Sequence, residues 1–440
     1  MKKSHFSLCA LSGCFLSGSA LAQSAQVPAP PQERPVIIEN ATIHIRPGET
    51  IAAPAYIVFD NGMITQFGQG QAPDIEGAER FGGDGLHVYP GLISCDTQLG
   101  LTEVGAVDVT QDFRELGDFT PEVRAVLAVN PDSDLIPVTR ANGIMVAATF
   151  PSGGLVSGRC AILRLDGWTW EQMAIEPEAG LVLNWPRTDP INAPWMRSNP
   201  EDQRRRVAEN LDKIDRFFDE ATAYFEAREA DPSLPVDLRF EGMKAAMKGE
   251  QPIFIRANSA SQIESSVAWA VSRGLRPVIV GGTEAHEAIP ILKKHDVPVI
   301  VGGTHRLPAR AHDPYDAAYT LPAKLHEAGV RFAIASGEET AHERSLPYAA
   351  ATAAAYGLPK DAALAAVTSS AAEVLGIADR YGSLDTGKSA TLIVTTGDPL
   401  EISSDTVLAF IDGRTIDLGS RHKRLYEKYL EKYRQVGAIE

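Results

Sequence analysis

The chain has 440 residues, with 41 lysines and arginines against 57 aspartates and glutamates, which gives a formal net charge of −16. This length can bury a large core, and it allows two or three units or one barrel with an appended domain. The acidic balance disfavours nucleic acid and anionic membranes as partners, because both attract a basic protein surface.

The first 22 residues have the pattern of a secretory signal peptide. Lys2 and Lys3 precede the apolar stretch FSLCALSGCFL, and ALA at 20–22 is a small-x-small cleavage signal. Cleavage there removes two lysines and no acid, which takes the net charge to −18. We therefore expect an exported protein, periplasmic or secreted. The alternative is a lipoprotein anchored through Cys14, because LSGC at 11–14 resembles a bacterial lipobox.

The rest of the chain contains no segment that reaches the roughly 18 apolar residues needed by a membrane-spanning helix, so we predict no transmembrane segment. Two cysteines remain beyond the signal, Cys95 and Cys160. They are too few for a disulfide framework, and we expect two small buried residues rather than a bridge. The sequence has no CxxC motif or Cys/His cluster, so a structural zinc site is not expected.

Both ends of the remaining chain indicate β structure. Residues 23–35 are Pro-rich and lack an apolar period, which predicts a flexible leader. Residues 36–85 alternate apolar and polar side chains, with DNG at 60–62 placed as a hairpin turn. Residues 386–418 show the same alternation around Asp412-Gly413. We predict that these two segments pair with each other as the two parts of a β-sandwich.

The middle of the chain, residues 86–385, follows a different pattern. Short apolar runs bounded by turn residues alternate with helical stretches, which predicts parallel strands covered by helices. The heptapeptide PVIVGGT occurs at 277–283 and again at 298–304, a spacing that fits one strand and one helix. Residues 155–185 indicate inserted β structure, and 200–229 indicate a long exposed helix. Residues 419–440 are expected to form a C-terminal helix.

Several motifs between residues 36 and about 418 resemble the amidohydrolase superfamily, and within it the imidazolonepropionase-like branch. They are YPGLI at 89–93, GTEA at 282–285 and the tail AAEVLGIADRYGSLDTGKSATLIVTTGDPLE. The resemblance implies an α/β fold, with a (β/α)8 TIM-like barrel over residues 86–385. It also implies a composite β-sandwich domain formed by both termini.

The resemblance implies a metal centre at the carboxyl ends of the barrel strands, and this chain departs from it. The family's His-x-His falls on Asp96-Thr97-Gln98, its fifth-strand histidine on Arg256, its sixth-strand histidine on Gly281 and its final aspartate on Gly337. The bridging residue of the fourth strand has no identifiable counterpart. Because a glycine offers no ligand and an arginine repels a cation, we predict no metal cofactor. A weakly bound divalent metal is the alternative.

Six polar residues near the predicted strand ends are the candidates for a site. Asp96, His305 and Glu338 are candidate catalytic acids or bases, and Gln98, Arg256 and Arg306 are candidate substrate-binding residues. Each has a structural alternative. Asp96 and Arg256 would form a replacement ion pair in the vacated pocket, Glu338 would cap a helix, and His305 would be a solvated loop residue.

Three functions follow from this pattern. The first is a hydrolase acting on carbon–nitrogen bonds other than peptide bonds, such as those of a cyclic amide, with a degraded metal site. The second is a catalytically inactive ligand-binding pseudoenzyme, or a partner subunit of an active amidohydrolase. The third is a structural or assembly role. In the first two cases the partner is a small-molecule ligand or substrate, and a homo-oligomer is an open alternative.

Overall fold

The computed structural model describes residues 26–191, 196–308, 310 and 312–439. The predicted signal peptide, with Cys14, lies outside the described residues. Within the described part of the chain, no helix combines the length and the apolar composition needed to cross a membrane. Cys95 and Cys160 are both buried and unpaired, as the sequence predicted.

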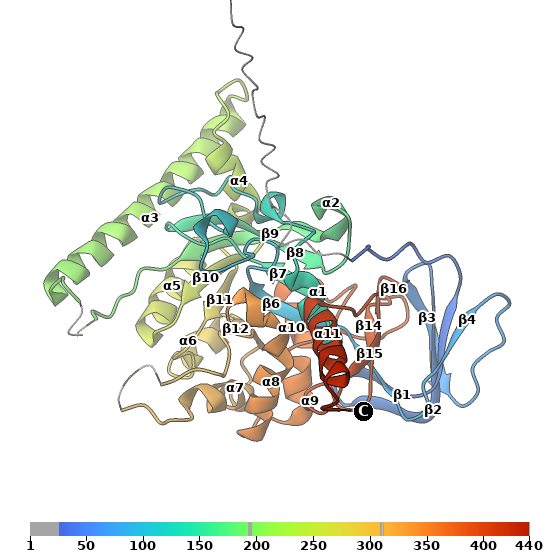
Figure 1. Ribbon diagram of the computed structural model, residues 1–440. Coiled ribbons are helices and arrows are strands. Elements are labelled where there is room, and N and C mark those ends of the chain that lie inside the picture. Colours follow the sequence, from blue (N-terminus) through green and yellow to red (C-terminus); the bar gives the residue numbers. More distant parts are fainter. Residues whose placement is uncertain (1–25, 192–195, 309, 311, 440) are drawn as a thin grey trace, which may run out of the picture.

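The two ends of the chain form one eight-stranded sheet, which lies beside the barrel (Figure 1). β5 joins the two halves, because it pairs in parallel with β1 and antiparallel with β14. The two ends therefore lie in one sheet, as predicted, but they are joined by β5, which the sequence analysis placed in the barrel range 86–385. The strands are β1 (Val36–Arg46), β2 (Glu49–Asp60), β3 (Met63–Gln69), β4 (Glu79–Gly82), β5 (His87–Pro90), β14 (Leu392–Thr395), β15 (Thr406–Ile411) and β16 (Arg414–Thr415).

Local turn chemistry explains the hairpins of this sheet. Asn61 and Gly62 have φ values of 50° and 80° between β2 and β3. Asp412 and Gly413 have φ values of 47° and 73° between β15 and β16. Tight two-residue hairpins need a positive φ at both central positions, and Asn-Gly and Asp-Gly adopt it at low cost.

The middle of the chain forms a second eight-stranded sheet, whose order β6 to β13 follows the sequence. Its strands are almost entirely buried, as expected for strands covered on both faces. Helices surround the sheet in the manner of a TIM-like barrel (Figure 1). The strands are β6 (Leu92–Thr97), β7 (Ile144–Thr149), β8 (Val156–Arg164), β9 (Ala174–Asn184), β10 (Ile253–Ala257), β11 (Pro277–Gly281), β12 (Val299–Val301) and β13 (Phe332–Ile334).

One strand of the barrel runs against the others. β8 pairs antiparallel with both β7 and β9, whereas every other neighbouring pair in this sheet is parallel. The segment 155–185, predicted as an insertion, thus contributes the third and fourth strands of the barrel sheet itself. The links before and after β8 are too short for a full helical crossover, so the chain reverses direction there.

No strand ladder joins β6 to β13 in the described part of the chain, so the barrel closes across a seam. The backbone before α10 fills it, because Ile93 N on β6 donates to Val367 O at 2.8 Å and Ile334 N on β13 donates to Ala366 O at 3.0 Å. These bonds hold the first and last strands together and complete the barrel.

The helices include the long one expected over 200–229. α3 spans 31 residues and buries Ile214, Phe217, Phe218 and Ala221 on one side. The α-helices are α1 (Leu135–Arg140), α2 (Trp170–Met173), α3 (Pro200–Ala230), α4 (Leu238–Met247), α5 (Ala260–Ser272), α6 (Ile289–Lys294), α7 (Ala317–Glu327), α8 (Leu346–Ala355), α9 (Lys360–Ala365), α10 (Ser369–Leu375) and α11 (Arg421–Gln435). The 3-10 helices are η1 (Asp108–Thr110), η2 (Ala125–Ala128) and η3 (Thr340–Ser345).

The described part of the predicted leader, residues 26–35, is fastened to the folded chain rather than free. Ala29 N donates to the Asp166 carboxylate at 3.1 Å, and Gln32 Nε2 donates to Phe59 O at 3.0 Å. Composition suggested flexibility because the segment lacks an apolar period. Its polar groups nevertheless find partners, on β2 and in the loop after β8.

The composite sheet depends on the packing of Phe410, which is fully buried against Phe59 and Phe81 at ring-centroid distances of 4.8 Å and 5.7 Å. We expect Phe410→Ala to lower the free energy of unfolding by about 3–5 kcal/mol, because the cavity would span segments from both chain ends. Urea denaturation measures this loss. Val407→Ala on the same strand, 48% exposed, is the control and should change stability by less than about 0.5 kcal/mol. A loss below about 1 kcal/mol for Phe410→Ala would contradict the described packing.

Candidate functional site

Asp96 and Arg256 meet near the carboxyl ends of β6 and β10, where barrel enzymes place their chemistry. Arg256 Nη2 donates to Asp96 Oδ1 at 2.7 Å, and Nη1 donates to Oδ2 at 3.0 Å. The two side chains are 19% and 30% exposed respectively, and the guanidinium lies 5.5 Å from the centre of the Phe150 ring. The ion pair expected from the sequence as a replacement is therefore present, in bidentate form.

The ion pair keeps Arg256 charged. Burial lowers the pKa of Arg256, but the attraction and hydrogen bonds of Asp96 outweigh burial and raise this pKa overall. A permanent positive charge thus sits at the position where the superfamily resemblance implies a metal-binding histidine. It neutralises Asp96 and repels a divalent cation.

Gly281 ends β11 at the position of the implied sixth-strand histidine, and both its backbone conformation and the Asn258 side chain oppose a side chain there. Its φ is +100°, and a Cβ atom there would lie 2.5 Å from Asn258 Oδ1. Thr283 Oγ1 donates to the same oxygen at 2.9 Å, which holds the Asn258 side chain in place.

Gly337 follows β13 at the position of the implied final aspartate, and it is equally closed. Its φ is +68°, and a Cβ atom there would lie 2.5 Å from Gly302 O. A side chain at Gly337 would therefore force the strand ends apart, whereas one at Gly281 would strain the backbone and displace the Asn258 side chain.

The metal centre implied by the superfamily resemblance does not fit these residues. Two of its ligand positions hold an ion pair, and two hold glycines whose Cβ would collide with neighbouring atoms. Across the described ranges, no group of three or more His, Cys, Asp or Glu side chains is arranged to hold a metal ion. The site can instead bind through fixed charge and hydrogen bonds.

Glu343 is a buried acid that the sequence reasoning missed. It lies on η3 with 1% exposure, and it bridges the barrel seam. Ser94 Oγ on β6 donates to Oε1 at 2.6 Å, and Ser336 Oγ after β13 donates to Oε2 at 2.9 Å. No local pattern marks this residue, because Ser94 is 249 positions away in the sequence.

The pKa of Glu343 is raised to about 7, mainly by burial. Hydrogen bonds from Ser94, Ser336 and Thr97 partly oppose the increase, and the nearby charge of Asp96 adds a smaller contribution to it. Glu343 therefore changes protonation near neutral pH, within the electrostatic reach of the Asp96–Arg256 pair. Its proton is exchanged inside the seam rather than in an open pocket.

The other candidates gather on the loops after β12 and β13. His305 Nδ1 lies 3.8 Å from Glu338 Oε1, and His305 Nε2 lies 2.8 Å from Thr352 Oγ1 on α8. Arg306 Nη1 donates to Thr283 Oγ1 at 2.8 Å, and burial lowers the pKa of Arg306.

Two further observations concern Gln98 and Glu338. Gln98 lies just beyond β6, where its backbone oxygen accepts from Leu101 N at 2.9 Å. The 3-10 helix after β13, η3, begins at Thr340, and the residue at its N-cap is Glu339, which makes no side-chain capping bond, so the expected capping role of Glu338 has no counterpart here.

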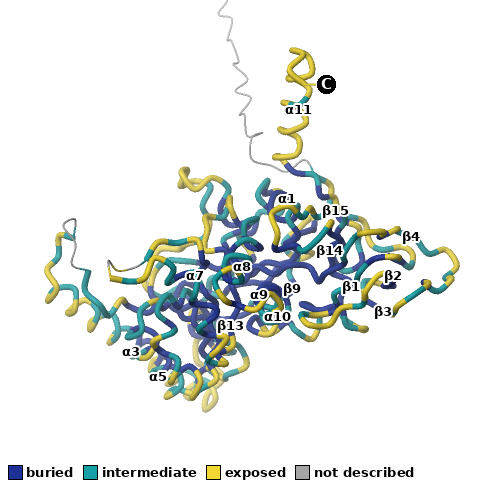
Figure 2. Tube along the Cα trace, turned by 90° about the horizontal axis from the view of Figure 1, so that it is seen from below, coloured by how far each residue is buried: buried dark blue, intermediate teal, exposed yellow. Residues whose placement is uncertain are grey.

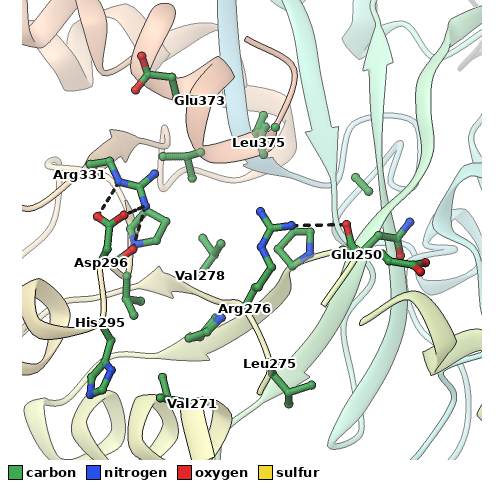
Figure 3. Close-up of a pocket in the computed structure, with 18 of the residues that line it drawn as sticks. Glu250, Val271, Leu275, Arg276, Val278, His295, Asp296, Arg331, Glu373 and Leu375 are labelled. Carbon is green, nitrogen blue, oxygen red and sulfur yellow. Dashed lines mark hydrogen bonds and ion pairs between the residues drawn. The ribbon is translucent and has the colours of Figure 1, made fainter. Parts of the chain in front are cut away.

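A pocket of about 730 Å³ lies at the opposite end of the barrel (Figure 3). It opens below the amino ends of β10 to β13, where Arg276, Glu250, Asp296 and Arg331 line it. Asp296 and Arg331 are paired at 2.9 Å. Catalytic residues of TIM barrels come from the carboxyl ends of the strands, so we do not take this pocket as the candidate active site.

Comparisons with known proteins agree with this architecture. Residues 291–417 match the model of the amidohydrolase family. The chain is 24% identical over 393 residues to the amidohydrolase tasK of Hapsidospora irregularis, which covers 81% of this chain and 39% of that protein. The chain thus spans well under two thirds of that curated relative.

Two solved structures have a similar fold. An amidohydrolase from Thermotoga maritima superposes with a TM-score of 0.77 at 23% identity, over 87% of this chain and 99% of that one. A prolidase complexed with N-methylphosphonate-L-proline superposes with a TM-score of 0.54 at 15% identity, also over 87% and 99%. At these identities the likeness concerns the fold alone.

The raised pKa of Glu343 predicts a pH-dependent stability. Its folded-state pKa of about 7 exceeds the ordinary value of 4.5, so the native protein holds this proton more tightly than the unfolded chain. The contribution is complete below pH 4.5 and is lost as the pH rises through about 7. The contribution of Glu343 to the free energy of unfolding should fall by roughly 3 kcal/mol over this window, and other titrating groups add their own changes to the total.

The measurement is urea denaturation from acidic to slightly alkaline pH. In Glu343→Gln the neutral amide should remove this part of the slope, while Glu338→Gln, a more exposed carboxylate nearby, should retain it. Equal slopes in wild type and Glu343→Gln would show that the buried carboxyl does not titrate in this window.

Proposed function

We propose that this chain, whose residues 291–417 match the amidohydrolase family and whose fold is similar to that of a solved amidohydrolase, is a ligand-binding member of that superfamily that works without its metal centre. The observation that carries the proposal is the Asp96–Arg256 ion pair at two of the implied metal-ligand positions. Gly281 and Gly337 support it, because a glycine supplies no side-chain ligand and a Cβ at either position would collide with neighbouring atoms. The imidazolonepropionase-like branch remains a prediction.

The expected ligand is a small anionic molecule such as a carboxylate. Arg256 is 30% exposed beside its partner, and Arg306 adds a second guanidinium among the loops of the same barrel end. A guanidinium fork matches a carboxylate with two parallel hydrogen bonds. A ligand of this kind would compete with Asp96 for Arg256.

We further propose that the chain works beside a related, active amidohydrolase. A superfamily member without a metal centre could bind a ligand for, or assemble with, a second unit that performs the hydrolysis.

A second candidate function is metal-independent hydrolysis of a cyclic amide. The contact between His305 and Glu338 supports it, because a carboxylate beside an imidazole orients a general base. His305 would take a proton from the water that attacks the carbonyl carbon, and this proton would pass to the leaving nitrogen as the C–N bond breaks. Arg256 would stabilise the negative charge that develops on the carbonyl oxygen.

Metal analysis of the purified protein tests the first proposal. After dialysis we expect substoichiometric zinc, and we expect no gain of tightly bound metal after incubation with zinc or manganese. Arg256→His, which restores a histidine at the fifth strand, should still not bind zinc tightly, because Gly281 and Gly337 supply no further ligand. Stoichiometric zinc whose removal abolishes a C–N hydrolase activity, and whose return restores it, would overturn the proposal. In parallel, Arg256→Gln should weaken the binding of small carboxylates by about tenfold or more.

Hydrolysis in the presence of a chelator separates the two candidates. A binding protein should turn over no cyclic amide of a test panel, and His305→Gln should behave as the wild type. The hydrolase candidate requires measurable turnover with chelator present and a loss of about 10²- to 10⁴-fold in His305→Gln. His286→Gln, on the loop after β11, is the matched histidine control and should retain that turnover.

A further inference from the structure

α11 (Arg421–Gln435) is a helix with no buried residue. Figure 2 shows it standing out from the body of the molecule. Its first turn stays near the barrel, where Arg424 Nη2 lies 3.5 Å from Asp134 Oδ1 beside α1. Ser420 caps it, because Lys423 N donates to the Ser420 hydroxyl at 3.3 Å. The helix is thus attached at one end and open to solvent along its length.

One side of α11 is apolar. The large apolar side chains of this region are between 40% and 67% exposed. They recur every three or four residues, which places them on one face of the helix. They are Leu425, Tyr426, Tyr429, Tyr433 and, just beyond the last turn, Val436.

The other side of α11 is basic. The helix carries six lysines and arginines against two glutamates, a net charge of +4 within a chain whose net charge is −16. Lys432 lies 5.7 Å and 6.0 Å from the rings of Tyr429 and Tyr433, so basic and aromatic side chains are in contact at the border of the two faces.

From these features we propose that α11 binds the surface of a membrane that contains anionic lipid, with its apolar face toward the acyl chains. Helices with a strongly polar face rich in Lys and Arg and an apolar face opposite lie in the plane of such surfaces. Tyrosine favours the headgroup region, because its ring is apolar and its hydroxyl is polar. The partner is recognised by its negative surface charge together with an apolar layer beneath it.

The chain's negative net charge does not forbid this contact, although the sequence as a whole disfavours anionic membranes. A helix of this length extends about 22 Å from its attached end, whereas charges are screened over about 8 Å at physiological ionic strength. Most of α11 therefore lies beyond the field of the acidic body. Pairing of two copies through α11 is disfavoured, because both helices carry the same positive charge.

Vesicle binding by the full chain tests the proposal. We expect the protein to co-sediment with vesicles of phosphatidylglycerol and phosphatidylcholine, but not with phosphatidylcholine alone, and binding should fall as salt is added. The triple variant Lys428→Glu, Lys432→Glu, Arg434→Glu should lower the partition coefficient by at least about tenfold. Tyr429→Ser with Tyr433→Ser keeps the charge and should also weaken binding, because it removes the apolar contact.

The matched control changes the same number of charges elsewhere. Arg204→Glu, Arg205→Glu, Arg206→Glu on exposed positions of α3 should leave the partition coefficient within about a factor of two. An equal loss in this control, or equal binding to both kinds of vesicle, would refute a role for α11. The proposal would also be refuted if the wild type bound no vesicles and instead formed a concentration-dependent dimer in light scattering that the tyrosine variant abolished. Circular dichroism of each variant checks that the helix and barrel remain folded.

Discussion

The barrel closes between β6 and β13 through hydrogen bonds that do not form a strand ladder, and the position of the site depends on this closure. The carbonyls of Ala366 and Val367 accept from the two strands, and Glu343 connects Ser94 with Ser336. A buried carboxyl costs free energy unless its hydrogen bonds are satisfied, so both serines are required at this seam. The closure fixes where the ends of the first and last strands lie.

Closing the barrel brings together residues that are far apart in the sequence, and it determines which charges are balanced internally. Asp96 and Arg256, separated by 160 positions, pair in bidentate geometry. In a metal-dependent site the acidic ligands would be balanced by a bound cation. Here a guanidinium of the chain itself balances Asp96.

The glycines at the strand ends complete this arrangement. Gly281 and Gly337 adopt positive φ angles, and their neighbours approach so closely that no Cβ fits. A metal ligand at either position would therefore require a change in the backbone conformation of the barrel as well as a different side chain. Glu343, with a pKa of about 7 in the same region, adds a proton that the seam exchanges near neutral pH.

The sequence by itself determined what local patterns encode. Two-residue alternation and the Asn61-Gly62 turn predicted the hairpins, and continuous apolar runs predicted the buried parallel strands. The family resemblance placed Asp96 and Arg256 at two implied metal-ligand positions and so predicted their ion pair. Only the tertiary structure decided the role of Glu343 and the close approach of Asn258 to Gly281. These features depend on contacts between distant segments. Such contacts leave no periodic signal in the chain, because each partner is selected by closure of the barrel rather than by its neighbours in sequence.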